Sequence, residues 1–184
     1  MKRMKFYGLG GQGVVTAAKV LSTAVSLYED KFAITVPSYG HERRGAPVYT
    51  DVVVDSQPIL LNCYVYEPDI VMVVDETVID KNIDVGSGRH DGTILVLNTA
   101  DTKTANRYAQ QFGFREIYYA DATSIALAHI GRGIPSGAML GALAKTGVVG
   151  IASVEAALRE MFGEKAGDKN ANAATATYEA ARAL

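Results

Sequence analysis

The sequence predicts a three-layer, Rossmann-like α/β domain with a mainly parallel sheet and C-terminal helices. Two observations support this prediction. Short apolar segments alternate with segments of helical periodicity over the first two thirds of the chain, and the last third is helical in pattern. The chain also begins with a strand–helix–strand pattern of about 30 residues, a length typical of a right-handed parallel crossover. The 184 residues are interpreted as one domain covering residues 1–184.

Six segments are predicted to be strands because they are rich in β-branched, aromatic and other apolar residues. In chain order they cover residues 5–9, 32–36, 48–54, 70–74, 93–97 and 116–119. Pro37 stops the second segment, and the turn-forming run Asp55–Pro58 closes the third. The fourth and fifth segments are continuously apolar, which is typical of central strands covered on both faces.

Six helices are predicted from apolar periodicity and from residues that begin or end helices. They cover residues 14–28, 102–112, 122–130, 135–146, 153–163 and 168–184. The first has apolar residues at spacings of three and four. Asp121 and Ser153 are suited to N-cap positions, and Pro135 to a first helical position. Glycines stand at or just past the expected ends of the third, fourth and fifth helices.

Composition excludes several classes of function. A net charge of −2 leaves no basic surplus to neutralise a phosphate backbone, so no nucleic-acid partner is expected. The single cysteine, Cys63, cannot hold an iron–sulfur cluster, and the three histidines are not at ligand spacing, so no metal site is expected on this chain. Cys63 is interpreted as a small packing residue.

The sequence also shows no membrane-spanning segment and no secretory signal. No apolar run approaches the roughly 20 residues that span a bilayer. Glycines and Lys19 interrupt the apolar stretch that follows the basic N-terminus, which argues against a secretory signal. A cytoplasmic protein without a membrane partner is expected. The aromatic residues are mostly tyrosine, which is compatible with burial against partner subunits.

A glycine turn stands between the first strand and the first helix, with the spacing G-x-G-x-x-G. Its candidate ligand-binding residues are Gly8, Gly10, Gly11, Gln12 and Gly13. Glycines allow a tight turn and close approach of a ligand, and the helix N-terminus offers free N–H groups to a phosphate. The second strand ends without the carboxylate that would hold an NAD ribose, since none appears before Glu42, so NAD is disfavoured. The alternative is that the glycines only let the helix pack close to the strand.

A polar loop follows the second strand, at the sheet edge where open α/β folds bind ligands. Its candidate residues are Ser38, Tyr39, Gly40, Glu42, Arg43, Arg44 and Gly45. The two arginines could clamp phosphates, pair with carboxylates of a neighbouring chain or belong to a solvated charged loop, and the sequence leaves these alternatives open. Asp75 and Glu76 follow the strand at 70–74, where they could contact a ligand or cap a helix.

Two motifs in order carry a family resemblance. The segment G-L-G-G-Q-G-V-V-T-A-A-K-V-L at Gly8, followed by S-Y-G-H-E-R-R-G-A-P-V at Ser38, resembles the gamma subunit of the 2-oxoacid:ferredoxin (acceptor) oxidoreductases. The resemblance continues through D-A-T-S-I-A at Asp121 and M-L-G-A-L-A-K-T-G at Met139, and so covers nearly the whole chain. The E-R-R-G-A-P form is similar to the pyruvate and 2-ketoisovalerate branch.

The resemblance implies a division of labour among subunits. The family oxidatively decarboxylates a 2-oxo acid, such as pyruvate, to acyl-CoA and CO₂. Thiamine diphosphate, Mg²⁺ and [4Fe–4S] clusters are expected on partner subunits of alpha, beta and delta type, with ferredoxin or another acceptor taking the electrons. The gamma chain is expected to cover the active-site cleft and help bind coenzyme A, through the glycine turn and the Ser38–Gly45 loop. It supplies no catalytic residue of its own.

Two other functions stay open at this stage. One is a stand-alone oxidoreductase that binds a nucleotide or a flavin. The other is a purely structural assembly subunit whose glycines serve packing.

Overall fold

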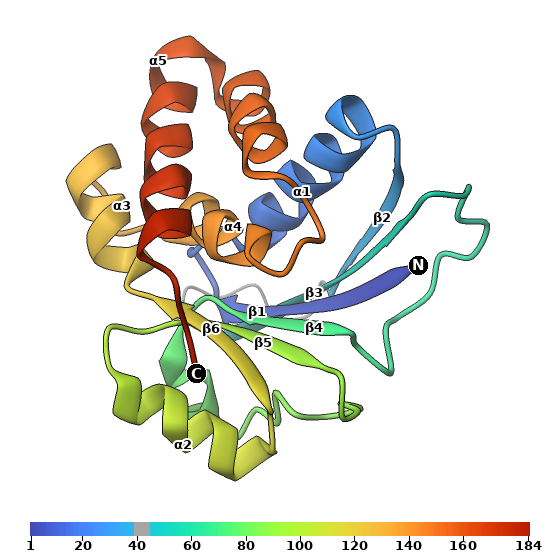
Figure 1. The fold of residues 1–184 in the computed structure, drawn as a ribbon, viewed down its shortest axis with the longest axis vertical. Coiled ribbons are helices and arrows are strands. Elements are labelled where there is room, and N and C mark those ends of the chain that lie inside the picture. The colour runs from blue at the N-terminus through green and yellow to red at the C-terminus, as the bar shows by residue number, and fades with distance from the viewer. Residues whose placement is uncertain (39–44) are drawn as a thin grey trace.

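A seven-stranded mixed sheet forms the centre of the structure, a computed structural model that describes residues 1–38 and 45–184 (Figure 1). The strand order is β2-β3-β1-β4-β5-β6-β7. In chain order the strands are β1 (Lys2–Leu9), β2 (Phe32–Pro37), β3 (Pro47–Asp55), β4 (Ile70–Val73), β5 (Ile94–Asn98), β6 (Glu116–Ala120) and β7 (Arg182–Ala183).

The α/β class is confirmed, but the sheet is mixed and not mainly parallel. Strands β1, β4, β5 and β6 pair in parallel, while β3 is antiparallel to both β1 and β2, and β7 is antiparallel to β6. The connection from β2 to β3 is shorter than the dozen or more residues that a parallel crossover needs, so β3 turns back beside β2. Strands β1 and β2 therefore run in the same direction, as predicted, with β3 between them.

The helices lie unevenly on the two faces of the sheet. They are α1 (Val14–Tyr28), the 3₁₀ helix η1 (Glu76–Lys81), α2 (Thr102–Phe112), α3 (Ala122–Ile130), α4 (Ser136–Ala144) and α5 (Ile151–Ala180). Helices α1, α3, α4 and α5 cover one face, and α2 lies on the other (Figure 1). Two apolar clusters result, one on each side of the sheet. Among the described residues, no helix combines the length and the apolar character needed to cross a bilayer.

The helical end of the chain differs from the prediction in several details. The segments predicted at 153–163 and 168–184 are the two arms of α5, which breaks at Gly163 because that glycine has φ 72° and ψ 172°. The first arm begins at Ile151 because Glu29 Oε1 accepts a hydrogen bond from the Gly150 amide at 2.6 Å, so Ser153 is not its N-cap. The chain then ends in the short strand β7 instead of continuing as helix to Leu184.

Candidate functional site

The glycine turn lies between β1 and α1, where β1 reaches the carboxyl edge of the parallel strands. Gly8 is still part of β1, and a Cβ there would come within 2.6 Å of Val14 Cγ2 and 3.3 Å of Val74 Cβ. Gly8 therefore lets α1 begin close to the sheet. Gly11 and Gly13 have φ of 94° and 79°, in the left-handed region that favours glycine, and they turn the chain from the strand into the helix.

The structure brings the end of the Ser38–Gly45 loop, here called the arginine loop, against the glycine turn. The Gly10 amide donates to the carbonyl of Ala46 at 2.8 Å, and the Gly45 amide donates to the Gly10 carbonyl at 3.1 Å. Ser38 lies at the end of β2, where its amide donates to the Tyr49 carbonyl at 3.2 Å. The predicted residues Tyr39, Gly40, Glu42, Arg43 and Arg44 lie outside the described residues. Gly10 and Gly45, which are 35 positions apart in the sequence, thus lie together at one sheet edge.

Two helix N-termini meet at this turn. The N-cap of α1 is Gly13, which has no side chain to cap the helix, and no hydrogen bond joins the amides of Gly11, Gly13 and residues 14–16 to another described residue. Helix α4 also lacks a side-chain cap, and its Ser136 Oγ lies 2.5 Å from where a Gly13 Cβ would be. The positive ends of two helix dipoles therefore converge beside free N–H groups, an arrangement that attracts an anion.

Gln12 holds the turn in place from inside. Its Oε1 accepts a hydrogen bond from the Leu9 amide at 2.7 Å, and its Nε2 donates to Asp75 Oδ2. Asp75 in turn caps η1 by accepting from the amide and hydroxyl of Thr77 at 2.8 and 2.6 Å. The capping role considered for Asp75 is confirmed. Both polar ends of the Gln12 side chain are used within the protein, so Gln12 braces the turn.

The Asp75 carboxylate carries its charge at neutral pH. Partial burial by itself would raise the pKa of Asp75, but the hydrogen bonds from Thr77 and Gln12 outweigh it and hold this pKa below its usual range. Asp75, which Gln12 contacts, therefore places a negative charge next to the glycine turn.

A buried ion pair lies on the face of the sheet opposite α1, and it was not predicted from the sequence. Asp51 is 1% exposed, and its Oδ1 lies 3.8 Å from Lys5 Nζ on the neighbouring strand β1. Asp51 Oδ2 accepts from the Val65 amide at 3.2 Å, and Lys5 Nζ donates to the Val65 carbonyl at 2.9 Å. Burial raises the pKa of Asp51, and burial together with the charge of Asp51 raises that of Tyr7. The sequence signal was a charged residue inside the apolar run at 48–54; its partner depends on the strand register.

Cys63 departs from its interpretation as a packing residue, because its side chain is exposed. It lies in an irregular segment before β4 that borders a cavity of about 700 Å³. In the described part of the chain, no three His, Cys, Asp or Glu side chains are gathered as a metal site would require.

Comparison with known proteins places this geometry in a family. The family described as pyruvate ferredoxin/flavodoxin oxidoreductase matches residues 3–180. The chain is 41% identical to the pyruvate/ketoisovalerate oxidoreductases common subunit gamma of Pyrococcus furiosus over 97% of this chain and 96% of that one. It is 43% identical to the pyruvate synthase subunit PorC of Methanothermobacter marburgensis, with 97% of each chain covered.

Solved structures share the fold. The pyruvate oxidoreductase subunit PORC of Thermotoga maritima matches with a TM-score of 0.84 and 32% identity, over 99% of this chain and 97% of that one. The 2-oxoglutarate:ferredoxin oxidoreductase of Magnetococcus marinus, solved with coenzyme A bound, matches with a TM-score of 0.71. This chain spans 31% of that enzyme at 16% identity, which shows a shared fold. By sequence and by fold, the chain therefore belongs to the pyruvate ferredoxin/flavodoxin oxidoreductase family, as a gamma-type subunit.

Proposed function

We propose that this chain works within a 2-oxoacid:ferredoxin oxidoreductase whose other subunits carry thiamine diphosphate, Mg²⁺ and [4Fe–4S] clusters. That enzyme converts pyruvate or a related 2-oxo acid and coenzyme A to acyl-CoA and CO₂, and passes two electrons to ferredoxin or another acceptor. The gamma chain covers the active-site cleft and helps hold coenzyme A at the carboxyl edge of its sheet.

The meeting of the glycine turn and the arginine loop carries this proposal. Gly10 is hydrogen-bonded to both Gly45 and Ala46, and Arg43 and Arg44 immediately precede Gly45 in the sequence. Turn amides with no partner among the described residues, two helix N-termini and two guanidinium groups all favour a ligand with several negative charges. The diphosphate and the ribose phosphate of coenzyme A have this chemistry, and an uncharged ligand would gain little from it.

A dinucleotide such as NAD fits this edge less well. Strand β2 ends at Pro37 and is followed by Ser38, so the carboxylate that would bind a ribose diol is missing from its usual place. A phosphate at the turn remains favourable without it. This difference supports coenzyme A over NAD as the ligand.

The two arginines provide the direct test of this ligand role. We expect the double variant Arg43→Gln/Arg44→Gln to raise the KM for coenzyme A at least tenfold in the purified complex. Loss of one or two charge-assisted hydrogen bonds, at about 1.5–3 kcal/mol each, corresponds to such a change. The kcat and the subunit composition should stay close to those of the wild type.

A matched double variant controls for the loss of two positive charges. Arg107→Gln/Arg115→Gln removes two exposed arginines, one on α2 and one just before β6, that form only surface ion pairs. It should leave the KM for coenzyme A unchanged. If Arg43→Gln/Arg44→Gln keeps the wild-type KM, the ligand role is wrong. If it releases the gamma chain instead, the arginines pair with a neighbouring subunit.

A further inference from the structure

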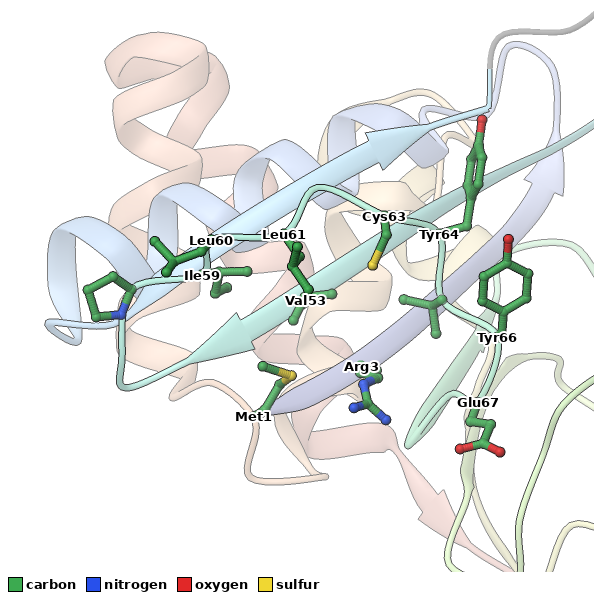
Figure 2. Close-up of a pocket in the computed structure, with 12 residues that line it drawn as sticks. Met1, Arg3, Val53, Ile59, Leu60, Leu61, Cys63, Tyr64, Tyr66 and Glu67 are labelled. Atoms are coloured by element: carbon green, nitrogen blue, oxygen red, sulfur yellow. The ribbon is translucent and has the colours of Figure 1, made fainter.

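The segment Pro58–Tyr66, here called the strap, crosses the sheet face opposite α1. Its nine residues, P-I-L-L-N-C-Y-V-Y, include no charged side chain. Figure 2 shows the strap passing over β3 and β1, with the cavity of about 700 Å³ between it and Met1, Arg3 and Val53. Depletion of charge together with enrichment in aromatic residues is typical of the core of a protein–protein interface.

The strap exposes far more apolar surface than a solvated loop needs. Leu60, Leu61, Tyr64 and Tyr66 are 91, 74, 50 and 76% exposed. A side chain of this size has an area of roughly 150–250 Å². Multiplied by these exposed fractions, the four side chains present roughly 600 Å² to solvent. The largest apolar patch on a typical monomer is roughly 300–600 Å². The strap alone thus reaches the upper end of that range.

Neighbouring side chains extend the apolar surface on the same sheet face. The register places Phe32 and Ile34 on the face of β2 that Val53 occupies on β3, and a second hollow joins them to Pro58 and Ile59 of the strap. Met1, Phe32 and Tyr49 are each 39–64% exposed. With them the apolar surface grows to roughly 900 Å², using the same area per side chain. One side of a standard protein–protein interface is roughly 800 Å².

The strap is fixed in this exposed position by the buried ion pair. Val65 is 2% exposed, and both polar groups of its backbone are bound by side chains, the amide by Asp51 and the carbonyl by Lys5. Figure 2 shows Tyr64 and Tyr66 on either side of this position extending in the same direction. A partner would therefore meet an ordered surface, and binding would cost little conformational entropy.

We propose that the strap and its apolar surroundings form the docking surface for one of the larger subunits of the same oxidoreductase, which presents an uncharged apolar patch of similar size. This inference rests on the proposed function. Tyr49, on the face that carries Asp51, pairs with Tyr7, and two residues farther along the strands Pro47 pairs with Leu9 at the glycine turn. The apolar surface is thus continuous with the edge proposed to hold coenzyme A. The occupant must carry the cofactor that coenzyme A meets, which a second copy of this chain would not supply.

Two leucines of the strap and one leucine elsewhere test the surface. All subunits are coexpressed, and the complex is purified through a tag on a larger subunit. We expect Leu60→Asn/Leu61→Asn to lower the amount of gamma chain recovered per larger subunit at least tenfold. Leu127→Asn, on α3 and 58% exposed, removes another exposed leucine on the opposite sheet face and should leave recovery unchanged. The thermal midpoints of the isolated variants should match that of the wild-type chain.

The single cysteine of the chain gives a second readout that needs no substitution. Cys63 is exposed on the strap, so N-ethylmaleimide should alkylate it readily in the free gamma chain. In the complex we expect alkylation of the Cys63 peptide, followed by mass spectrometry, to be at least tenfold slower. Equal rates in the free and assembled chain would overturn the proposal, as would full recovery of the leucine double variant.

Two further outcomes separate this inference from others. If sedimentation shows that the isolated wild-type chain dimerises, and Leu60→Asn/Leu61→Asn makes it monomeric while the complex stays intact, the occupant is a second copy and the proposal is wrong. Failure of the coenzyme A role would appear differently, as an unchanged KM in Arg43→Gln/Arg44→Gln. When excess gamma chain restores assembly of the leucine variant, its KM for coenzyme A should be that of the wild type.

Discussion

Asp51 occupies a position in β3 where the apolar pattern on both sides would favour a hydrophobic side chain. Its carboxylate is buried, and it remains there because Lys5 and the Val65 amide contact it. A buried ion pair is weak evidence for stability, but removal of one partner leaves an uncompensated charge. We interpret the ion pair as the contact that holds the strap on the sheet.

Substitutions at Asp51 should separate its charge from its shape. Asp51→Leu leaves the Val65 amide without an acceptor and the Lys5 ammonium without its counter-charge, and should lower the free energy of unfolding by about 3 kcal/mol. Asp51→Asn keeps an acceptor oxygen for the amide, and should change it by less than about 1 kcal/mol at pH 7. Urea unfolding of the isolated chain measures both. Equal losses for the two variants would contradict this role.

The raised pKa of Asp51 also predicts a pH dependence with a definite sign. Because this pKa is higher in the folded than in the unfolded chain, the folded state holds the proton more tightly. The contribution of Asp51 to stability therefore falls as pH rises from the ordinary value of 3.8 through the folded pKa. Asp51→Asn lacks this loss, so its free energy of unfolding should improve relative to the wild type between pH 4 and 7. If the free energy of unfolding of Asp51→Asn instead falls relative to that of the wild type over this range, the assignment is wrong.

A carboxylate in place of the Gln12 amide, beside Asp75, should destabilise the chain. In Gln12→Glu the donor to Asp75 is lost and two negative charges face each other, so the free energy of unfolding at pH 7 should fall by about 1–3 kcal/mol. Part of this loss should be recovered toward pH 4, as one of the two carboxyl groups takes up a proton. Gln110→Glu, an exposed position on α2, serves as the control in the same denaturant titration and should have little effect.

At the scale of elements, the close packing of α4 against α5 limits the size of the side chain at the contact between the two helices. All nine residues of α4 are buried, and a Cβ on Gly141 would lie 1.9 Å from the Ala174 carbonyl oxygen of α5. The two helix backbones therefore approach one another as closely as a glycine permits. The backbone carbonyl cannot move aside as the end of a flexible side chain could.

Gly141→Ala should therefore destabilise the chain, although alanine favours helix. We expect a loss of about 2–3 kcal/mol from overpacking, after the gain of roughly 1 kcal/mol in helix propensity. Gly133→Ala is the matched control, because a Cβ there would meet only a Thr123 methyl group at 3.4 Å. Its effect should stay within about 0.5 kcal/mol. Thermal unfolding compares the two, and a neutral Gly141→Ala would show that α4 and α5 can separate at little cost.

At the scale of the whole molecule, the proposed function assigns to this chain a binding edge and an apolar docking face, and assigns the chemistry to its partner subunits. We expect the purified chain alone to reduce no viologen dye with pyruvate and coenzyme A, whereas the reconstituted complex should do so. Reduction of the dye by the isolated chain would contradict the division of labour.

Local sequence patterns were enough to predict the α/β class, the helices α1, α2 and α3 to the residue, and the two motifs of the candidate site. These features are local, because apolar periodicity, glycine spacing and N-cap residues act over one or two turns of chain. Family membership also followed from the sequence, since the order and spacing of the motifs are sequence properties.

Only the tertiary structure decided which strands are neighbours, and several conclusions depend on that. Insertion of β3 between β1 and β2 made the sheet mixed, placed Lys5 opposite Asp51, and brought Gly45 and Ala46 against Gly10. Cys63 and the leucines of the strap are exposed in the folded chain, although their apolar character by itself would have predicted burial. Register and burial result from contacts between residues far apart in the chain, and a local pattern carries no information on which distant partner will be chosen.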